Sequence, residues 1–155
     1  MSRSSCETVA VAGDCLIVIL EEKLSILGVN SIRRGLELLG SEYEQVGYVS
    51  CIKENCASAD VQTRELMADV VRRHTTRIGA AAMVVSGEGF RSTLVRSVLT
   101  GIHLASGATH PLRTFSALDP ALAWYERKRP RRKLGLAALR EAVIGVYPPA
   151  AQTLR

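Results

Sequence analysis

A regular alternation of short apolar runs and longer amphipathic segments constrains this chain more than any other feature. Residues 46–52 and 80–85 are almost continuously apolar, as in strands of a parallel sheet that is covered on both faces. In the segments that follow each run, apolar residues recur every three or four positions, which is typical of amphipathic helices. Strands that alternate with helices predict an α/β fold with a mostly parallel sheet and right-handed connections.

The two ends of the predicted sheet differ. Residues 8–12 and 15–20 are β-prone runs separated by Gly13 and Asp14, which predicts an antiparallel hairpin at one edge. Residues 112–118 supply the last strand. The expected order is therefore a hairpin followed by alternating helices and strands.

Capping residues predict the limits of the first two helices. The first helix would be capped by Asn30 or Ser31 and end at Gly40. The second follows the loop at 55–60, in which Ser58 or Asp60 is the N-cap. The side chains that these helices would turn toward the core are Ile32, Leu36, Leu39, Leu66, Met67, Val70, Val71 and His74.

The third helix follows a glycine turn at 86–90, and the fourth begins with Asp119 as N-cap and Pro120 in its first turn. Glycine at positions 87 and 89 is explained by a tight turn, and Glu88 would repel a phosphate bound there. We therefore expect a structural turn rather than an anion site. The core-facing side chains of these two helices are Leu94, Val95, Val98, Leu99, Ile102, Ala121, Trp124 and Tyr125.

Length and composition indicate one domain without a membrane anchor. The chain has 155 residues, of which 47% are hydrophobic, enough for a single core. It contains no apolar run of about 18 residues and its start lacks the apolar region of a secretory signal, so we expect no transmembrane helix and a cytoplasmic location. Without a CxxC pair, the cysteines read as reduced, buried thiols: Cys6, Cys15, Cys51 and Cys56.

Basic charge is concentrated near the C-terminal end. Residues 127–155 hold eight basic residues against Glu141, a net charge of +7, so residues 1–126 carry −2 of the total of +5. This distribution describes a basic extension rather than a basic domain surface. The extension also carries an amphipathic segment that would form a helix with Leu136, Leu139 and Val143 on one side. Three readings stay open: a solvated tail, a partner-docking element, or a segment that folds back over the core.

Two local patterns resemble the STAS domain, the fold of anti-sigma factor antagonists, and especially its SpoIIAA-like or STAS/SEC14-like branch. The patterns are VVSGEGFRSTLVRS at 84–97 and PLRTFSALDPALAWYERK at 111–128. The resemblance covers about residues 7–129, which we predict to be a single STAS-like domain, followed by a basic extension at 130–155. It implies a small cytoplasmic module that acts through protein contacts and needs no cofactor.

The resemblance also implies a regulatory serine. In the signalling branch, a serine at the start of the second helix is phosphorylated within a motif similar to D-x-S-G. The matching region here is NCASADVQ, in which Ser58 is the counterpart, although neither the Asp before it nor the Gly after it is present. Phosphorylation of Ser58 is therefore a hypothesis beside its plain reading as a loop residue or helix cap.

The sequence offers little support for an enzyme. Ser86 lacks the GxSxG context of a serine hydrolase, and His74, His103 and His110 have no close ligand spacing for zinc. His74 lies on an apolar stripe, His103 faces away from the stripe of its helix, and His110 precedes Pro111 in a loop. We expect no metal site and no cofactor.

The preferred interpretation is a non-enzymatic regulatory or scaffold module that contacts a protein partner, and self-association stays open. The alternatives are a binding domain for a small ligand such as a nucleotide or lipid, near the glycine turn and neighbouring helices, and attachment to nucleic acid or anionic membrane through the basic extension. Besides Ser58, the candidate contact residues are Arg91, Arg96, Arg127, Lys128, Arg129, Arg131, Arg132, Lys133, Leu136, Leu139 and Val143.

Overall fold

The strands of the computed structural model form one sheet in sequence order. The structure describes residues 2–3, 7–54, 56–87 and 89–146. Within them, β1 and β2 pair antiparallel, as do β2 and β3, whereas β3 to β6 pair in parallel. The expected α/β fold with an antiparallel edge is confirmed, with β1 as an additional strand. The strands are β1 (Ser2–Arg3), β2 (Glu7–Ala12), β3 (Cys15–Leu20), β4 (Val46–Ile52), β5 (Ile78–Val85) and β6 (Leu112–Phe115).

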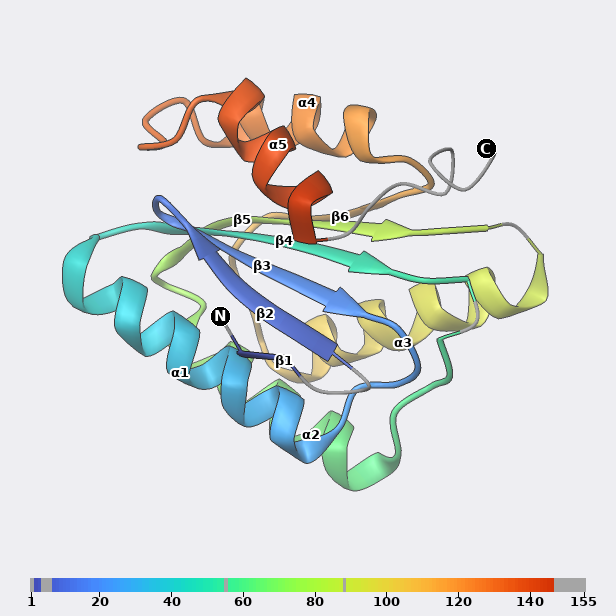
Figure 1. The fold of residues 1–155 in the computed structure, drawn as a ribbon. Coiled ribbons are helices and arrows are strands. Elements are labelled where there is room, and N and C mark those ends of the chain that lie inside the picture. Colours follow the sequence, from blue (N-terminus) through green and yellow to red (C-terminus); the bar gives the residue numbers. More distant parts are fainter. Residues whose placement is uncertain (1, 4–6, 55, 88, 147–155) are drawn as a thin grey trace.

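The helices cover both faces of the sheet (Figure 1). Because the parallel strands follow one another in order and such connections are right-handed, the three connecting helices lie on the same face. These are α1 (Ile26–Glu42), α2 (Val61–His74) and α3 (Phe90–Ala105), whereas α4 (Leu118–Lys128) and α5 (Leu136–Val146) cover the other face.

Alternation along the strands builds two cores. On β3, the side chains of Leu16, Val18 and Leu20 belong to the cluster beneath α1 and α2. Those of Cys15, Ile17 and Ile19 belong to the cluster beneath α4 and α5. Successive side chains of a strand point to opposite faces, so the continuous apolar runs predict the double coverage that the structure has.

The predicted limits of α1 are wrong at both ends. Ser25, rather than Asn30 or Ser31, is the N-cap, since its Oγ accepts a hydrogen bond from the amide of Gly28. The helix continues through Gly40 to Glu42; Tyr43 then takes an extended conformation while its amide still donates to the Leu39 carbonyl at 2.8 Å. For α2, Asp60 is the N-cap and accepts from the Thr63 amide at 2.8 Å, which confirms one of the two predicted caps.

The last part of the predicted domain also differs in its boundaries. β6 ends at Phe115 rather than at 118, and α4 begins at Leu118 with Ala117 as its N-cap position. Asp119 therefore lies in the first turn of α4, where its carboxylate pairs with Arg140 of α5 at 2.8 Å. α2 ends at His74, and Gly79 lies within β5.

The segment after α4 folds back over the sheet. Leu139 and Val143 of α5 are buried in the second core beside Tyr125 and Leu122. Residues 136–146 therefore cover part of the core, which is the third of the three interpretations left open by the sequence. The division at 129/130 stays a prediction, and residues 147–155 lie outside the described part. None of the described helices is long and apolar enough to cross a membrane.

Candidate functional site

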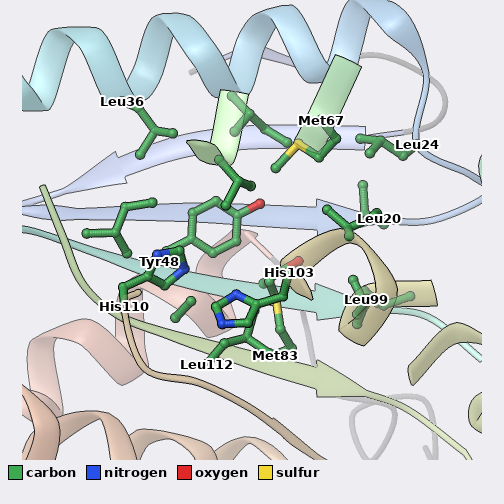
Figure 2. Close-up of a pocket in the computed structure, with 17 residues that line it drawn as sticks. Leu20, Leu24, Leu36, Tyr48, Met67, Met83, Leu99, His103, His110 and Leu112 are labelled. Carbon is green, nitrogen blue, oxygen red and sulfur yellow. The ribbon is translucent and has the colours of Figure 1, made fainter. Parts of the chain in front are cut away.

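An apolar cavity lies between the sheet and the three helices of the first core. Its volume is about 60 Å³. β3, β4 and β5 form its floor, and α1, α2 and α3 contribute its walls. Figure 2 shows Tyr48, His103 and His110 projecting into the same space, among apolar neighbours such as Met67, Met83 and Leu99.

Strand register explains why this space exists. Tyr48 of β4 pairs with Ala81 of β5, and Ser50 pairs with Met83. Each pair therefore sets a long side chain beside a short one on the face beneath the helices. The short side chains of Ser50 and Ala81 leave volume that the helices above do not fill, although protein interiors are otherwise closely packed.

Helix α3 covers the cavity without being fully buried itself. Among its residues whose side chains are described, Ser92 alone is buried, whereas Val95, Leu99 and Ile102 are only partly so. Glycines with positive φ flank the helix, at Gly87 (86°) and Gly89 (94°) before it and Gly107 (66°) after it. α3 is thus the most weakly packed wall of the cavity, between two turns that need glycine.

A fixed hydrogen-bond arrangement holds His110 at one end. The amides of Thr109 and His110 donate to Thr75 Oγ1 at 2.9 and 3.3 Å. With both oxygen lone pairs engaged, the Thr75 hydroxyl donates its proton to His110 Nδ1, 2.8 Å away. Nδ1 therefore accepts a hydrogen bond, as it can only in the uncharged imidazole. Burial and the neighbouring His103 lower the pKa of His110 to about 4.

His103 of α3 lies edge-on to His110, with ring centroids 5.0 Å apart. Its Nδ1 is buried and has no hydrogen-bond partner among the described residues, and burial lowers its pKa. The prediction that His103 faces away from its helix's stripe is wrong, because the ring lines the cavity. His103 follows Leu99 by four positions, which places both side chains on the same side of α3.

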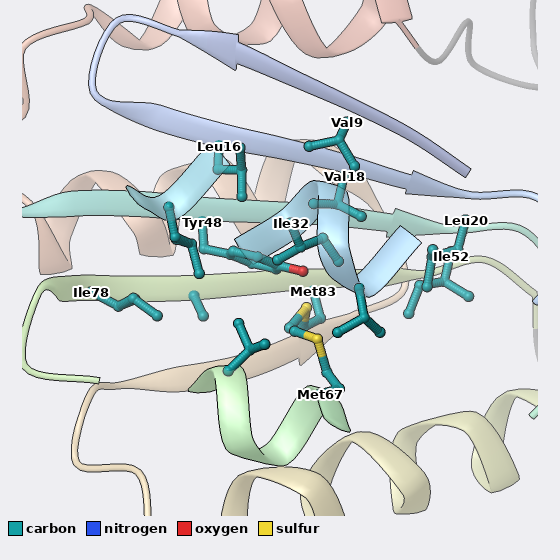
Figure 3. Close-up of a cluster of buried hydrophobic side chains, with 14 of the residues drawn as sticks. Val9, Leu16, Val18, Leu20, Ile32, Tyr48, Ile52, Met67, Ile78 and Met83 are labelled. Atoms are coloured by element: carbon teal, nitrogen blue, oxygen red, sulfur yellow. The ribbon is translucent and has the colours of Figure 1, made fainter. Parts of the chain in front are cut away.

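Tyr48 brings a second polar group into this apolar space. Figure 3 shows its ring within the cluster of buried side chains, near Ile32 and Met83. Burial raises the pKa of its hydroxyl, because the phenolate would lose its hydration in these apolar surroundings. The cavity thus offers hydroxyl and imidazole groups but no carboxylate, ammonium or guanidinium among its lining residues.

A smaller cavity of about 40 Å³ continues beneath α3 toward the loop before α2. It shares Leu20, Leu24, Ile52, Leu99 and Ile102 with the first cavity. Its other end is lined by the loop that carries Ser58. The predicted regulatory serine is exposed and lies at the edge of this apolar space, which the sequence did not indicate; its phosphorylation stays a prediction.

The glycine turn before α3 is partly covered by an acidic side chain. A Cβ added at Gly87 would lie 2.7 Å from Glu54 Cγ, so Glu54 lies against the turn that an anion would need. Glu88 is outside the described residues. Arg91 is exposed, whereas Arg96 donates to Ser116 Oγ at 2.9 Å. Among the described residues, the two arginines share no hydrogen-bond partner.

The basic residues at 127–133 differ in exposure, and some of them are held against the fold rather than solvated as in a tail. Arg129 is only 6% exposed and donates to Asp14 Oδ2 at 2.8 Å and to Tyr125 Oη. Arg132 pairs with Glu126 at 3.1 Å. A partner contact through Arg129, Leu139 or Val143 would require these buried side chains to leave the core. The exposed or partly exposed candidates are Arg127, Lys128, Arg131, Arg132, Lys133 and Leu136.

The exposed part of this segment borders a hollow of about 580 Å³. Lys128, Arg131 and Lys133 line it, and so do Glu42 and Glu44. Charges of both signs give this hollow a mixed potential rather than the single-sign field that attracts polyanions. Among the described residues, no group of three or more His, Cys, Asp or Glu is placed to hold a metal ion.

Comparison with known proteins connects this architecture to a solved fold. By sequence, the chain matches no known protein-family profile and no curated protein. By structure, it is similar to an uncharacterized protein of the DUF3478 family from Shewanella loihica PV-4, described as having a SpoIIAA-like fold. The TM-score is 0.58 at 14% identity, over 81% of this chain and 98% of the other. The chain therefore has a SpoIIAA-like fold, as the sequence resemblance implied.

Proposed function

We propose that this protein is a non-catalytic module that binds a small, mainly apolar molecule beneath α3. The observation that carries the proposal is the cavity of about 60 Å³, which is lined almost wholly by apolar side chains yet contains Tyr48 and His103. Ligand sites are concave, mostly apolar and equipped with a few polar groups that orient the ligand. A partly buried helix over the cavity provides a way in.

The polar groups of the cavity do not form a catalytic arrangement. The Thr75 hydroxyl accepts hydrogen bonds from two backbone amides and lies against His110 Nδ1. It therefore stabilises a turn rather than serving as a nucleophile. His110, with a pKa near 4, is a poor general base at neutral pH. We accordingly propose binding without turnover. A reducing cytoplasm suits Cys15 and Cys51, whose thiols are buried and free.

A variant with a filled cavity tests this function. Ala81→Leu adds three carbons at a residue that lines the cavity, and Ser50→Val is a second, smaller filling change. We expect molecules that raise the melting temperature of the native chain to lose that effect in Ala81→Leu. If the molecules raise the melting temperature of the native chain and of both filled variants equally, the proposal is contradicted. It is also contradicted if no molecule in a library of small apolar compounds raises the melting temperature of the native chain.

A second candidate function is contact with a protein partner, and the outer surface of α2 and α3 favours it. An open groove of about 380 Å³ runs between α2 and α3. Val61 at the start of α2 is 60% exposed, and Leu94 of α3 is 44% exposed. Both lie on the elements next to the Ser58 loop, where the STAS resemblance expects a partner. The basic extension stays a further candidate surface, and a second copy of the chain is one partner to consider.

A charge substitution on this surface separates the partner hypothesis from ligand binding. Val61→Glu places a carboxylate on the exposed start of α2, and Leu27→Glu, at a residue 71% exposed on α1, is the matched control. If a partner docks on α2 and α3, its binding will weaken in Val61→Glu and persist in Leu27→Glu. Equal binding by both variants would rule out this surface, without bearing on the cavity.

A further inference from the structure

The charge of the cavity wall restricts what can enter it. None of the residues that line it is Asp, Glu, Lys or Arg. The imidazole of His110 is uncharged where its Nδ1 accepts from Thr75. An ionised carboxylate or phosphate would lose its hydration here without gaining an opposite charge, which is strongly unfavourable.

The polar groups of the wall restrict the ligand further. His103 Nδ1 has no hydrogen-bond partner within the described part of the chain, and Tyr48 lies within the apolar cluster of the first core. Buried polar groups are normally hydrogen-bonded, and an unpaired one costs free energy. A hydroxyl group on the ligand can pair with His103 Nδ1, whereas a hydrocarbon leaves that nitrogen unpaired; Tyr48 lines the same cavity and adds a second hydroxyl-bearing wall residue.

Volume sets the size of the ligand. The cavity of about 60 Å³ is smaller than an engineered apolar cavity of about 150 Å³ that binds benzene. The adjoining space of about 40 Å³ beneath α3 extends it only slightly. A ligand of one ring is therefore larger than the space present and enters only if α3, the most weakly packed wall, shifts outward, whereas a long-chain lipid is excluded.

We propose that the cavity beneath α3 selects a small uncharged molecule that carries one hydroxyl group on an apolar body. The proposal rests on the ligand-binding function proposed above and names its ligand class. In this proposal Tyr48 and His103 recognise the hydroxyl group of the ligand, and the apolar lining of the cavity excludes anions.

Three probes of similar size test this selection: benzyl alcohol, toluene and benzoate. Their dissociation constants for the full chain are measured at pH 7.5 from chemical-shift changes of cavity residues. We expect benzyl alcohol to bind about five-fold more tightly than toluene, the effect of about one neutral hydrogen bond. Benzoate, which is ionised at this pH, should bind at least ten-fold more weakly than benzyl alcohol.

Tyr48→Phe removes one recognising group and keeps the ring, so the preference for benzyl alcohol over toluene should fall. Tyr43→Phe is the matched control, since Tyr43 packs against the same core but does not line the cavity. Equal affinity of the native chain for benzyl alcohol and toluene, or benzoate binding as tightly, would overturn the proposed ligand class while leaving cavity binding intact. Failure of all three probes to shift cavity residues would overturn the cavity function itself.

Discussion

Arg129 Nη2 donates to Asp14 Oδ2 at 2.8 Å, joining two residues that are 115 positions apart. The Arg129 side chain is 5% exposed and the Asp14 side chain 2%. The same carboxylate oxygen accepts from the Lys133 amide at 3.1 Å. The pair therefore attaches the start of the basic segment to the turn between β2 and β3, and with it the chain that leads into α5.

Removing one partner of this pair should destabilise the fold. Arg129→Ala leaves the Asp14 carboxylate buried without its counter-charge, which we expect to lower the free energy of unfolding by about 3–5 kcal/mol. The double variant Asp14→Leu with Arg129→Met removes both charges and should recover a large part of that loss. Urea denaturation measures the free energy of unfolding of both variants. If Arg129→Ala is as stable as the native chain, the buried ion pair does not stabilise the fold as described.

Two glycines predict opposite responses to alanine. At Gly47 of β4, an added Cβ would collide with Tyr125 Oη of α4, so Gly47→Ala should push α4 away from the sheet and lower stability. At Gly101 of α3, nothing lies within 4 Å of an added Cβ, and Gly101→Ala should stabilise the helix by about 0.5–1 kcal/mol. Thermal denaturation compares the two, and the same sign of change for both would count against the packing described.

His110 predicts a loss of stability in mild acid. Its pKa of about 4 in the fold is well below the value of about 6.5 for an unfolded histidine, so the unfolded chain binds the proton more readily. The contribution of His110 is complete above about pH 6.5 and is lost as the pH falls toward 4. From pH 7 to pH 5 we expect a loss of about 2 kcal/mol.

His110→Gln should remove that part of the pH dependence, and urea denaturation at pH 7, 6 and 5 measures it. His74→Gln is the control, since burial also lowers the pKa of His74 but His74 is only partly buried. The same profile for the native chain and His110→Gln would show that His110 is not the titrating group.

Local sequence patterns predict most of this fold, because strand burial and helix amphipathicity are properties of neighbouring residues. The runs at 15–20, 46–52 and 80–85 are all strands, and Asp60 caps α2 as one of two expected residues. The start of α1 was missed because Asn30 and Ser31 are of the residue types that favour an N-cap, although Val29 just before them is buried in the same core as Ile32.

The cavity, in contrast, could not be predicted from the sequence. It depends on which strand residues face each other, and the pairing of Tyr48 with Ala81 is set by register rather than by either local pattern. His103 and His110 are brought together by the return of the chain after α3. Burial of Arg129 likewise depends on Asp14, and a basic run alone is typical of an exposed segment.

The most direct measurement of the central claim is the methyl spectrum of the full chain with ¹³C-labelled methionine, titrated with benzyl alcohol. The sequence has three methionines, of which Met67 and Met83 line the cavity, while Met1 lies outside the described residues. Binding beneath α3 predicts saturable shifts of the Met67 and Met83 signals and none in Ala81→Leu. If these two signals stay unchanged at saturating probe, or shift equally in Ala81→Leu, the cavity is not a ligand site.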